Sequence, residues 1–425
     1  MKIPRGFFIV LLPLGISSVQ AAVPFTYGER TRDFSGWTPA AYGDLNLVTM
    51  GGTAVALPTS IAAAEANPAG YALLTSSIVA QVNRTSFRAP DIQKSGKSID
   101  SLQWGLGVSP PPWGFAFAYY SPMMEQGDYI SPLTGHTVRT EASIKDFRLT
   151  TSRFFFKGTL ALGVSADLMK AVREIGDRSY NTMGLSYRLG ALVRLPAHVI
   201  LGASYAPEVR LAPATDTPPE YEMPGFNRAI LLPRQISFGV GWMPSRFFRA
   251  GMSMTHVAAT RNTALLADQS ILTGGKSTWV PRLGLSYVLL DYRSFRAEGT
   301  VGVYHEQSRI SGVANRFHKT LGLEGNIYPF NVAVGFDLAQ NFKNVILSVG
   351  IDIVRGARLL AIIPSDPVPA YNGILPPMHK INASGLSTGL TEGERKRYEA
   401  PSVEDVGEII SNIPRRIKEK FSGAP

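Results

Sequence analysis

The sequence contains one motif that is typical of a serine nucleophile. Residues Gly385–Gly389 are Gly-Leu-Ser-Thr-Gly, which matches the Gly-x-Ser-x-Gly pattern of a nucleophile elbow. An elbow of this kind needs a strand before it and a helix after it. Here the motif lies in a stretch rich in proline and glycine, so the flanking elements are missing. We therefore expect no catalysis at Ser387 and predict that the protein is not an enzyme.

Histidine and cofactor chemistry find little support in the sequence. The six histidines lack the spacing of metal ligands, and no phosphate-binding or dinucleotide loop is present. They are His136, His198, His256, His305, His318 and His379. We expect no cofactor. A barrel esterase that uses a serine and a histidine of its wall stays an alternative, although no pairing in the sequence points to one.

Charged residues on one face of alternating segments offer binding chemistry instead. They are Arg148, Asp167, Arg188, Arg282, Arg296, Glu298, Glu324, Asp337 and Asp352. A guanidinium binds carboxylates and phosphates through two parallel hydrogen bonds. We therefore predict that one or two of Arg148, Arg188, Arg282 and Arg296 bind the anionic head group of a ligand. The alternative is that all these charges form ion pairs that line a hydrated interior.

The segments that carry these charges alternate with a period of two. In Leu160–Met169, every second residue from Leu160 is apolar, and the residues between are alanine, glycine, serine and aspartate. Val345–Ile353 repeats the pattern with Val, Leu and Ile on one face. Such alternation indicates β-strands. A soluble sandwich would carry Lys, Glu and Thr on its polar face, whereas small residues suit a strand that lines an interior.

An apolar outer face and a small inner face predict a transmembrane barrel. Only helices and closed barrels satisfy every backbone group inside a bilayer, and no downstream segment has 18 consecutive apolar residues. We predict an all-β protein, a transmembrane antiparallel β-barrel of about 14 strands with an N-terminal α-helical hatch and a C-terminal periplasmic extension. The expected strands are 76–86, 99–109, 113–121, 144–154, 159–169, 180–194, 198–206, 234–242, 249–256, 280–289, 295–304, 319–327, 331–338 and 345–354.

The connections and the chain ends place this barrel in a cell envelope. Short connections after even-numbered strands alternate with longer ones, which is typical of outer-membrane barrels and puts both termini in the periplasm. Residues 1–21 have a basic start, an apolar stretch and small residues at a cleavage site, as a signal peptide does. The alternative is an N-terminal membrane anchor. Export argues against nucleic acid as the partner of the net charge of +10, and outer-membrane lipid is the expected surrounding.

These patterns divide the chain into four parts. Residues 1–21 are the signal peptide, 22–75 an N-terminal extension and hatch, 76–355 the barrel, and 356–425 a Pro/Gly-rich periplasmic extension with a terminal amphipathic helix. That helix, over 402–421, is expected either to bind a periplasmic protein or the inner leaflet, or to pack against the barrel's own mouth. The alanine-rich run before Asn67 favours helix, which the Asn-Pro-Ala-Gly sequence should stop.

A barrel of about 14 strands is too wide for its own side chains to fill. The small, apolar segment Met50–Leu74 directly precedes the first strand, so we expect it to lie inside the barrel as a plug. This segment resembles the N-terminal hatch of the FadL/TodX family of outer-membrane transporters. Gly51, Gly52, Asn67, Pro68 and Ala69 match the family pattern, and Leu232–Trp242 is similar to a family strand that opens with Leu-Pro.

The resemblance implies passive transport of long-chain fatty acids or other hydrophobic small molecules past the plug, by a monomer. Two departures limit what it carries over. About 25 additional residues precede the hatch, and about 70 follow the last strand, so the family's ligand contacts are not transferred. Similar hatches also occur in a shuttle barrel of type IX secretion. The alternative function is therefore an outer-membrane scaffold or shuttle that binds a periplasmic or secreted protein.

Overall fold

The structure, a computed structural model, describes residues 48–353 with several short gaps. The gaps are 59, 61–62, 74–77, 89–98, 110–111, 131–136, 176–177, 213–228, 246, 261–276, 292–294, 309–314, 328 and 341. The expected signal peptide, residues 22–47, the extension 356–425 with its helix at 402–421, and the Gly385–Gly389 motif all lie outside the described residues.

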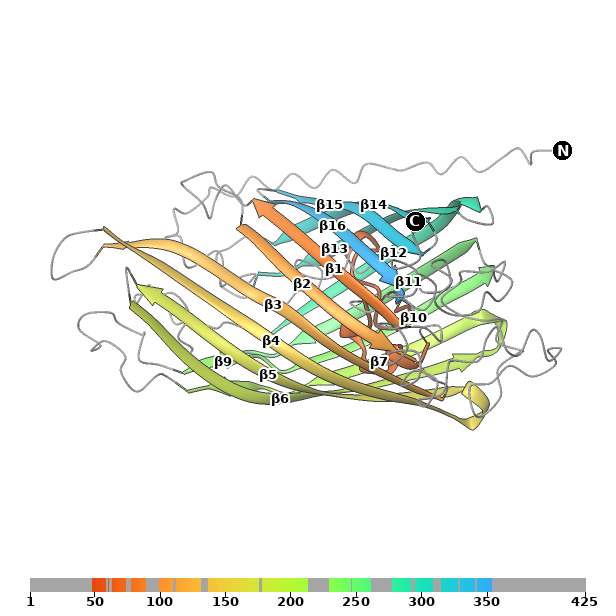
Figure 1. Cartoon of the computed structure of the whole chain (residues 1–425), viewed down its shortest axis with the longest axis horizontal. Coiled ribbons are helices and arrows are strands. Elements are labelled where there is room, and N and C mark those ends of the chain that lie inside the picture. Colours follow the sequence, from red (N-terminus) through yellow and green to blue (C-terminus); the bar gives the residue numbers. More distant parts are fainter. Residues whose placement is uncertain are drawn as a thin grey trace, which may run out of the picture.

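Fourteen antiparallel strands form a closed barrel, in which β1 pairs with both β2 and β16 (Figure 1). Its strands are β1 (Ile78–Arg88), β2 (Ile99–Val108), β3 (Trp113–Ile130), β4 (Thr137–Phe155), β5 (Leu160–Ile175), β6 (Arg178–Leu195), β7 (Val199–Ala206), β10 (Gln235–Ser245), β11 (Phe248–Val257), β12 (Thr278–Asp291), β13 (Phe295–Glu306), β14 (Arg316–Ile327), β15 (Phe330–Ala339) and β16 (Phe342–Asp352). The predicted all-β barrel of 14 strands is confirmed.

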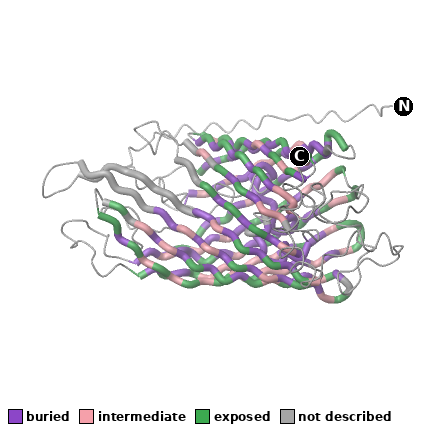
Figure 2. Tube along the Cα trace, in the orientation of Figure 1, coloured by how far each residue is buried: buried purple, intermediate pink, exposed green. Residues whose placement is uncertain are grey.

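The alternating sequence pattern becomes an alternation of burial along each strand (Figure 2). In β14, Leu321 and Leu323 are exposed at 55% and 49%, whereas Thr320, Gly322 and Glu324, which alternate with them, are buried. Large apolar side chains are thus on the outside of the barrel around its circumference, and small or polar side chains are on the inside. This is the reverse of a soluble protein, and it is the arrangement that a barrel in lipid requires.

The two ends of the barrel differ in their connections. The connections after β2, β4, β6, β10, β12 and β14 are short, and two of them are single 3-10 turns, η3 (Phe156–Gly158) and η4 (Pro196–His198). We call this the short-connection end. The other end, where the longer connections lie, is called the long-connection end.

Four neighbouring strands are much longer than the others. Strands β3 to β6 have 16–19 residues, whereas the remaining barrel strands have 8–14, and the long wall projects beyond the rest of the barrel on the left of Figure 1. The predicted strands 113–121 and 144–154 are shorter than β3 and β4, which extend to Ile130 and begin at Thr137. The additional residues are more polar, and alternation weakens where a strand leaves the apolar layer.

A two-stranded sheet that the sequence did not predict packs against this long wall. Strands β8 (Val209–Leu211) and β9 (Ile230–Leu232) pair only with each other and are not part of the barrel sheet. Their apolar residues form one buried cluster with Ile144, Met169 and Ala171. Strands of three residues are too short to show a period of two, so the sequence pattern predicts only a connection between 206 and 234.

The segment before the first strand is helical, but not in the predicted form. Its described residues form two 3-10 helices, η1 (Ala63–Ala66) and η2 (Pro68–Leu73), rather than one α-helix over the alanine run. Pro68 begins the second helix instead of ending the first, which is possible because proline lacks only an N–H that the first helical position does not use. None of the helices formed by the described residues has the length and apolar character that crossing a membrane requires.

Candidate functional site

The described residues between 48 and 73, here called the inner segment, lie against the inward face of the barrel. Glycines on that face make this contact possible. A Cβ atom on Gly114 of β3 would lie 2.5 Å from the backbone of Tyr71, and one on Gly302 of β13 would overlap the backbone at Met50 and Gly51. The same holds for other inward glycines, whose added Cβ would overlap atoms of the inner segment. They are Gly163, Gly190, Gly202, Gly241, Gly284 and Gly322.

Asn67 joins the two halves of the inner segment to the wall. Its Nδ2 donates to the carbonyl of Val55 at 2.8 Å and to the carbonyl of Ala191 in β6 at 3.0 Å. Its Oδ1 accepts from the N–H of Ala69 at 3.1 Å. The side chain is completely buried. Asn67 therefore connects a loop, a helix and a strand through one amide group.

The glycine pair at the start of the inner segment adopts a conformation that favours glycine. Gly51 and Gly52 have φ of 63° and 82°. A Cβ on Gly51 would lie 2.7 Å from the carbonyl oxygen of Leu283 and 2.8 Å from that of Val303. Beside this turn, Thr300 donates to the hydroxyl of Thr49 at 2.6 Å. All five predicted hatch residues lie in the inner segment and are buried. They are Gly51, Gly52, Asn67, Pro68 and Ala69.

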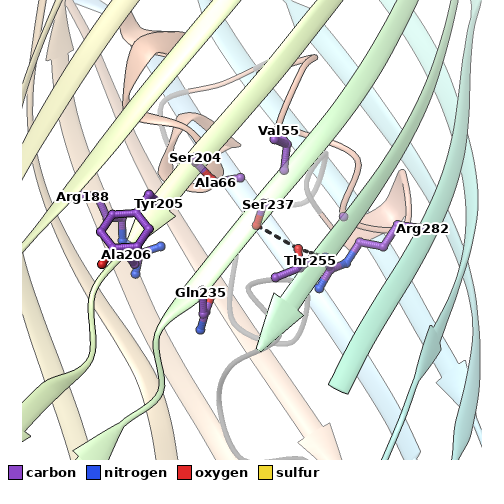
Figure 3. A pocket seen from close by; sticks show the side chains of 11 residues that line it. Val55, Ala66, Arg188, Ser204, Tyr205, Ala206, Gln235, Ser237, Thr255 and Arg282 are labelled. Atoms are coloured by element: carbon purple, nitrogen blue, oxygen red, sulfur yellow. Dashed lines mark hydrogen bonds between the residues drawn. The ribbon is translucent and has the colours of Figure 1, made fainter. Parts of the chain in front are cut away.

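A pocket lies where the inner segment meets the wall on the β6–β12 side (Figure 3). The inner segment contributes Gly52, Val55 and Ala66, and the wall contributes the remaining residues. Those are Arg188 of β6, Ser204, Tyr205 and Ala206 of β7, Gln235 and Ser237 of β10, Thr255 of β11 and Arg282 of β12. The lining combines small apolar groups with hydroxyls, one amide and two guanidinium groups.

Arg282 is the buried cation of this pocket. Its Nη1 donates to Thr255 Oγ1 at 2.6 Å, and the Thr255 hydroxyl is 2.9 Å from that of Ser237 (Figure 3). The side chain is only 4% exposed, yet its Nε and Nη2 have no hydrogen-bond partner among the described residues. A buried guanidinium with two unused donors is suited to an anionic oxygen.

Arg188 enters the same pocket from β6, but it belongs to an ion-pair network. Its Nε lies 3.5 Å from Asp167 Oδ2, and Asp167 Oδ1 accepts from Arg148 Nε at 2.9 Å. Arg148 also binds Asp146 at 2.5 Å and lies over the ring of Tyr120. With two carboxylates around it and 1% exposure, Arg148 is neutralised inside the protein and does not line the pocket.

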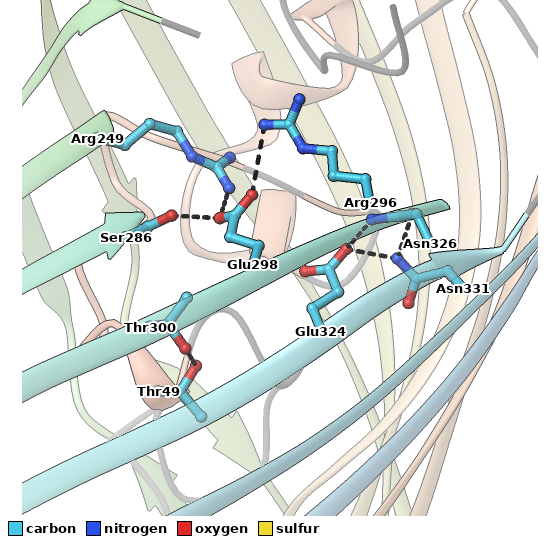
Figure 4. Close-up of polar contacts among 9 residues, drawn as sticks. All are labelled: Thr49, Arg249, Ser286, Arg296, Glu298, Thr300, Glu324, Asn326 and Asn331. Atoms are coloured by element: carbon cyan, nitrogen blue, oxygen red, sulfur yellow. Dashed lines mark hydrogen bonds and ion pairs between the residues drawn. The ribbon is translucent and has the colours of Figure 1, made fainter. Parts of the chain in front are cut away.

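Arg296 lies outside the pocket, at the end of β13 near the short connections (Figure 4). It is 3.6 Å from Glu298, which also binds Arg249 and accepts from Ser286. Glu324 forms a separate cluster with the amides of Asn326 and Asn331. Of the four predicted arginines, the structure therefore brings Arg188 and Arg282 to one pocket, and it places Arg148 and Arg296 in ion pairs elsewhere.

A second buried network was not recognised in the sequence. His318 of β14 lies between two carboxylates, 2.8 Å from Asp337 and 3.2 Å from Glu306. Tyr304 donates to Asp337 at 2.6 Å and stacks on the histidine ring at 4.1 Å. The inward parity of β13 and β14 could have revealed this grouping. No group of three His, Cys, Asp or Glu side chains within the described residues is placed to hold a metal ion.

The neutral residues that line the pocket were also not predicted from the sequence. Gln235, Ser237 and Thr255 occupy inward positions, and each is paired across strands in a register that sequence alone does not give. The parity of each strand could have marked these residues as inward. Their meeting around Arg282 depends on the register between β10, β11 and β12.

No protein-family model and no curated protein matches the sequence. Solved structures do match the fold. A monoaromatic hydrocarbon channel, CymD, is similar with a TM-score of 0.54 and 10% identity over 73% of this chain and 96% of its own. The toluene transporter TbuX of Ralstonia pickettii gives 0.53 and 12% over 74% and 98%. A FadL homologue of Pseudomonas aeruginosa gives 0.53 and 12% over 73% and 98%.

These structures are covered almost from end to end, while about a quarter of this chain lies outside the similarity. At 10–12% identity the match concerns the path of the backbone and not the residues of a site. Within the matched region, this chain has the fold of the FadL/TodX channels.

Proposed function

We propose that the protein is an outer-membrane channel through which hydrophobic small molecules with an anionic group, long-chain fatty acids above all, diffuse passively past the inner segment. The observation that carries this proposal is Arg282. It is a buried guanidinium with two unused donors, in a pocket bounded by the inner segment on one side and by the barrel wall on the other.

The outward face supports placement in a membrane. Exposed Leu, Val, Phe and Trp side chains occupy the outside of the strands, for example Leu185 at 80% and Leu149 at 63%. Leaving this surface in water would be unfavourable, by about 25 cal/mol for each Å² of apolar area. Closed barrels of this kind cross the outer membrane of Gram-negative cells.

The channels of similar fold support the substrate class. Their names specify monoaromatic hydrocarbons and toluene, which are apolar compounds. An apolar compound partitions poorly into a polysaccharide-coated leaflet, so a protein route is useful to it. In this chain, Arg188 and Arg282 add a feature that an uncharged hydrocarbon does not need. A carboxylate at the head of an apolar chain would satisfy both the guanidinium groups and the small apolar groups of the pocket.

The inner segment would act as the plug. It packs its backbone and its side chains against inward glycines of strands from β3 to β14, so we expect passage to require a shift of this segment and not of the wall. Its contacts are mostly between small residues, which can slide over short distances without opening large cavities. Diffusion down a gradient then needs neither a cofactor nor an energy source, and one copy of the barrel suffices.

Purified protein in liposomes tests the proposal. Oleate binding and uptake should be saturable, and Arg282→Met should weaken oleate binding about ten- to a hundredfold, since a charge-assisted hydrogen bond contributes roughly 1.5–3 kcal/mol. Arg296→Met is the matched control, because Arg296 is an inward arginine outside the pocket. If neither oleate nor toluene binds or crosses, the channel function is wrong, and the scaffold or shuttle function becomes the better interpretation. If toluene crosses and oleate binding ignores Arg282, the anionic substrate is wrong.

A further inference from the structure

The outward face of the long wall changes from apolar to basic at one level. On β4 and β5 the outward positions run from Phe155 and Leu160 at the short-connection end to Phe147 and Leu168, and the one charged residue among them, Arg153, lies next to the short-connection end and stacks on Trp113. The next outward pair after these apolar residues is Lys145 of β4 and Lys170 of β5. These two lysines are direct cross-strand partners.

The position of this pair matches the edge of a lipid layer. Lys145 and Lys170 are ten residues along their strands from the partners Phe155 and Leu160. At about 3.3 Å per residue and a strand tilt of roughly 40°, this is a rise of about 25 Å. The outward apolar band of an outer-membrane barrel is about 25 Å tall. Both lysines therefore reach the level where lipid head groups begin.

The pair carries two like charges without a counter-ion. Directly opposed side chains on antiparallel strands have Cβ atoms about 4.5–5.5 Å apart, and like charges there are destabilising. The carboxylates on the inward positions next to the pair, Asp146 and Asp167, bind Arg148 inside the barrel. Among the described residues, neither Lys145 nor Lys170 forms an ion pair. An anion between the two ammonium groups would remove the repulsion.

Apolar surface lies directly below the pair. Phe147 packs its ring 5.1 Å from that of Tyr119, and Leu168 is paired with Leu185, which is 80% exposed. Both lysines are half-buried, and a lysine in such a place can lay its alkyl stem along apolar surface while its ammonium group reaches the polar phase. The combination of two cations above an apolar slope fits an amphiphile whose head carries a phosphate.

We propose that Lys145 and Lys170 bind the phosphate of an outer-leaflet lipid, whose acyl chains lie against Phe147, Leu168 and Leu185. The inference depends on the membrane placement of the barrel but not on what the channel transports. The site would fix lipid at the long wall, the part of the barrel whose strands project beyond the others (Figure 1).

The barrel also offers a matched control pair. Lys319 of β14 and Lys343 of β16 are exposed outward lysines, and each is paired with Leu338 of β15, which separates them. Two strand spacings of about 4.8 Å put their backbones about 10 Å apart. The control removes the same charge from the same outer surface, but from lysines that are separated by a strand and by Leu338 and are not directly opposed to each other.

The experiment measures binding of bis-phosphorylated lipid A to the full-length protein in detergent, by native mass spectrometry. Lys145→Gln with Lys170→Gln should lower the affinity about ten- to thirtyfold, since each lysine near a lipid head group contributes about 1 kcal/mol. Lys319→Gln with Lys343→Gln should change it less than about threefold. Heat-dependent gel mobility would verify that both variants are folded barrels.

Two further measurements separate the phosphate and lipid contributions. Dephosphorylated lipid A should bind wild type and the Lys145/Lys170 variant equally, and inorganic phosphate alone should not compete at millimolar concentration. Equal loss in both double variants, or no loss in either, would overturn the proposal. Oleate uptake should be unchanged by Lys145→Gln with Lys170→Gln, so failure of this inference and failure of the channel function are distinguishable.

Discussion

Two zones of the barrel interior, only one inward position apart, are built in opposite ways. On β6, Gly190 meets the inner segment, whereas Arg188, the next inward residue toward the long-connection end, lines the pocket and contacts Asp167. On β5, Gly163 meets the inner segment and Asp167 holds Arg148. The wall has glycines where it faces the inner segment, and it has charged residues at inward positions just beyond that segment.

The difference shows that the inner segment is held mainly by shape and the zone beyond it mainly by charge. Where a glycine lies against backbone, a larger side chain disrupts the contact, because the added atoms overlap backbone atoms that cannot move aside. A buried charge fails when its partner is removed, because the remaining charge stays desolvated. Substitutions in the two zones should therefore have different effects. Those in the charged zone should lower the stability of the barrel, and those in the glycine zone should raise its permeability.

The largest effect is expected in the charged zone. Arg148→Met would remove the guanidinium that binds the buried Asp146 and would leave Asp167 with only the longer contact to Arg188, at a cost of roughly 3–5 kcal/mol. The measurement is denaturant unfolding of the barrel in detergent. Arg153→Met is the control, because Arg153 is exposed on the outside of the same strand and stacks on Trp113. Similar stability of the two variants would contradict the view that charge compensation holds this zone together.

The glycine zone should respond through permeability. A side chain at Gly190 would overlap Asn67, Pro68 and Ala69. Gly190→Val should overpack the contact by about 1–3 kcal/mol, displace the inner segment and raise small-solute leakage into liposomes. Gly350→Ala is the control, because the atom nearest to its added Cβ would be 3.5 Å away. Unchanged leakage in Gly190→Val would show that the inner segment does not plug the barrel.

The alternation predicted the strands and the inward face, but not the partners on that face. Arg148 and Arg282 are equivalent by parity, yet Arg148 faces Asp167 in the β4–β5 register while Arg282 faces Ser253 and Tyr304. Register follows from turn geometry and from bulges such as the one between Val288 and Leu290 in the pairing of β12 with β13, which no periodicity reveals. The sequence therefore identifies candidate cations and leaves open which one keeps free donors.

The inner segment shows a different limit. Its small residues and its Asn-Pro-Ala sequence predicted a compact element before the first strand, and two short helices were found there. Alanine propensity favoured an α-helix, but contacts with the wall determine the geometry instead. Local propensity is a weak guide where tertiary contacts are this dense.

A moderate effect is expected at Asn67, the amide that joins the inner segment to the wall. Asn67→Ala would remove donors to Val55 and Ala191 and leave those carbonyls buried, at a cost of about 1–3 kcal/mol. The barrel should stay folded while hydrogen exchange in the inner segment becomes faster. Asn67→Asp, which keeps the acceptor for Ala69 but places a carboxylate oxygen against both carbonyls, should be at least as destabilising as the alanine variant. Protection as in wild type would mean that glycine contacts alone hold the segment.

The smallest effect concerns the hydroxyl pair at the other end of the inner segment. Thr300→Val removes the donor to Thr49 while keeping the shape, so we expect a loss of about 1 kcal/mol in unfolding free energy. Thr49 would keep its backbone bond from Thr320 at 2.8 Å, so leakage should not change. The sharper measurement is the double variant with Thr49→Val. Replacing both hydroxyls with methyl groups leaves neither donor nor acceptor unsatisfied, so the double variant should be no less stable than Thr300→Val alone. Additive losses would instead show that each hydroxyl has an independent partner, and that the bond between them does not fasten the inner segment to β13.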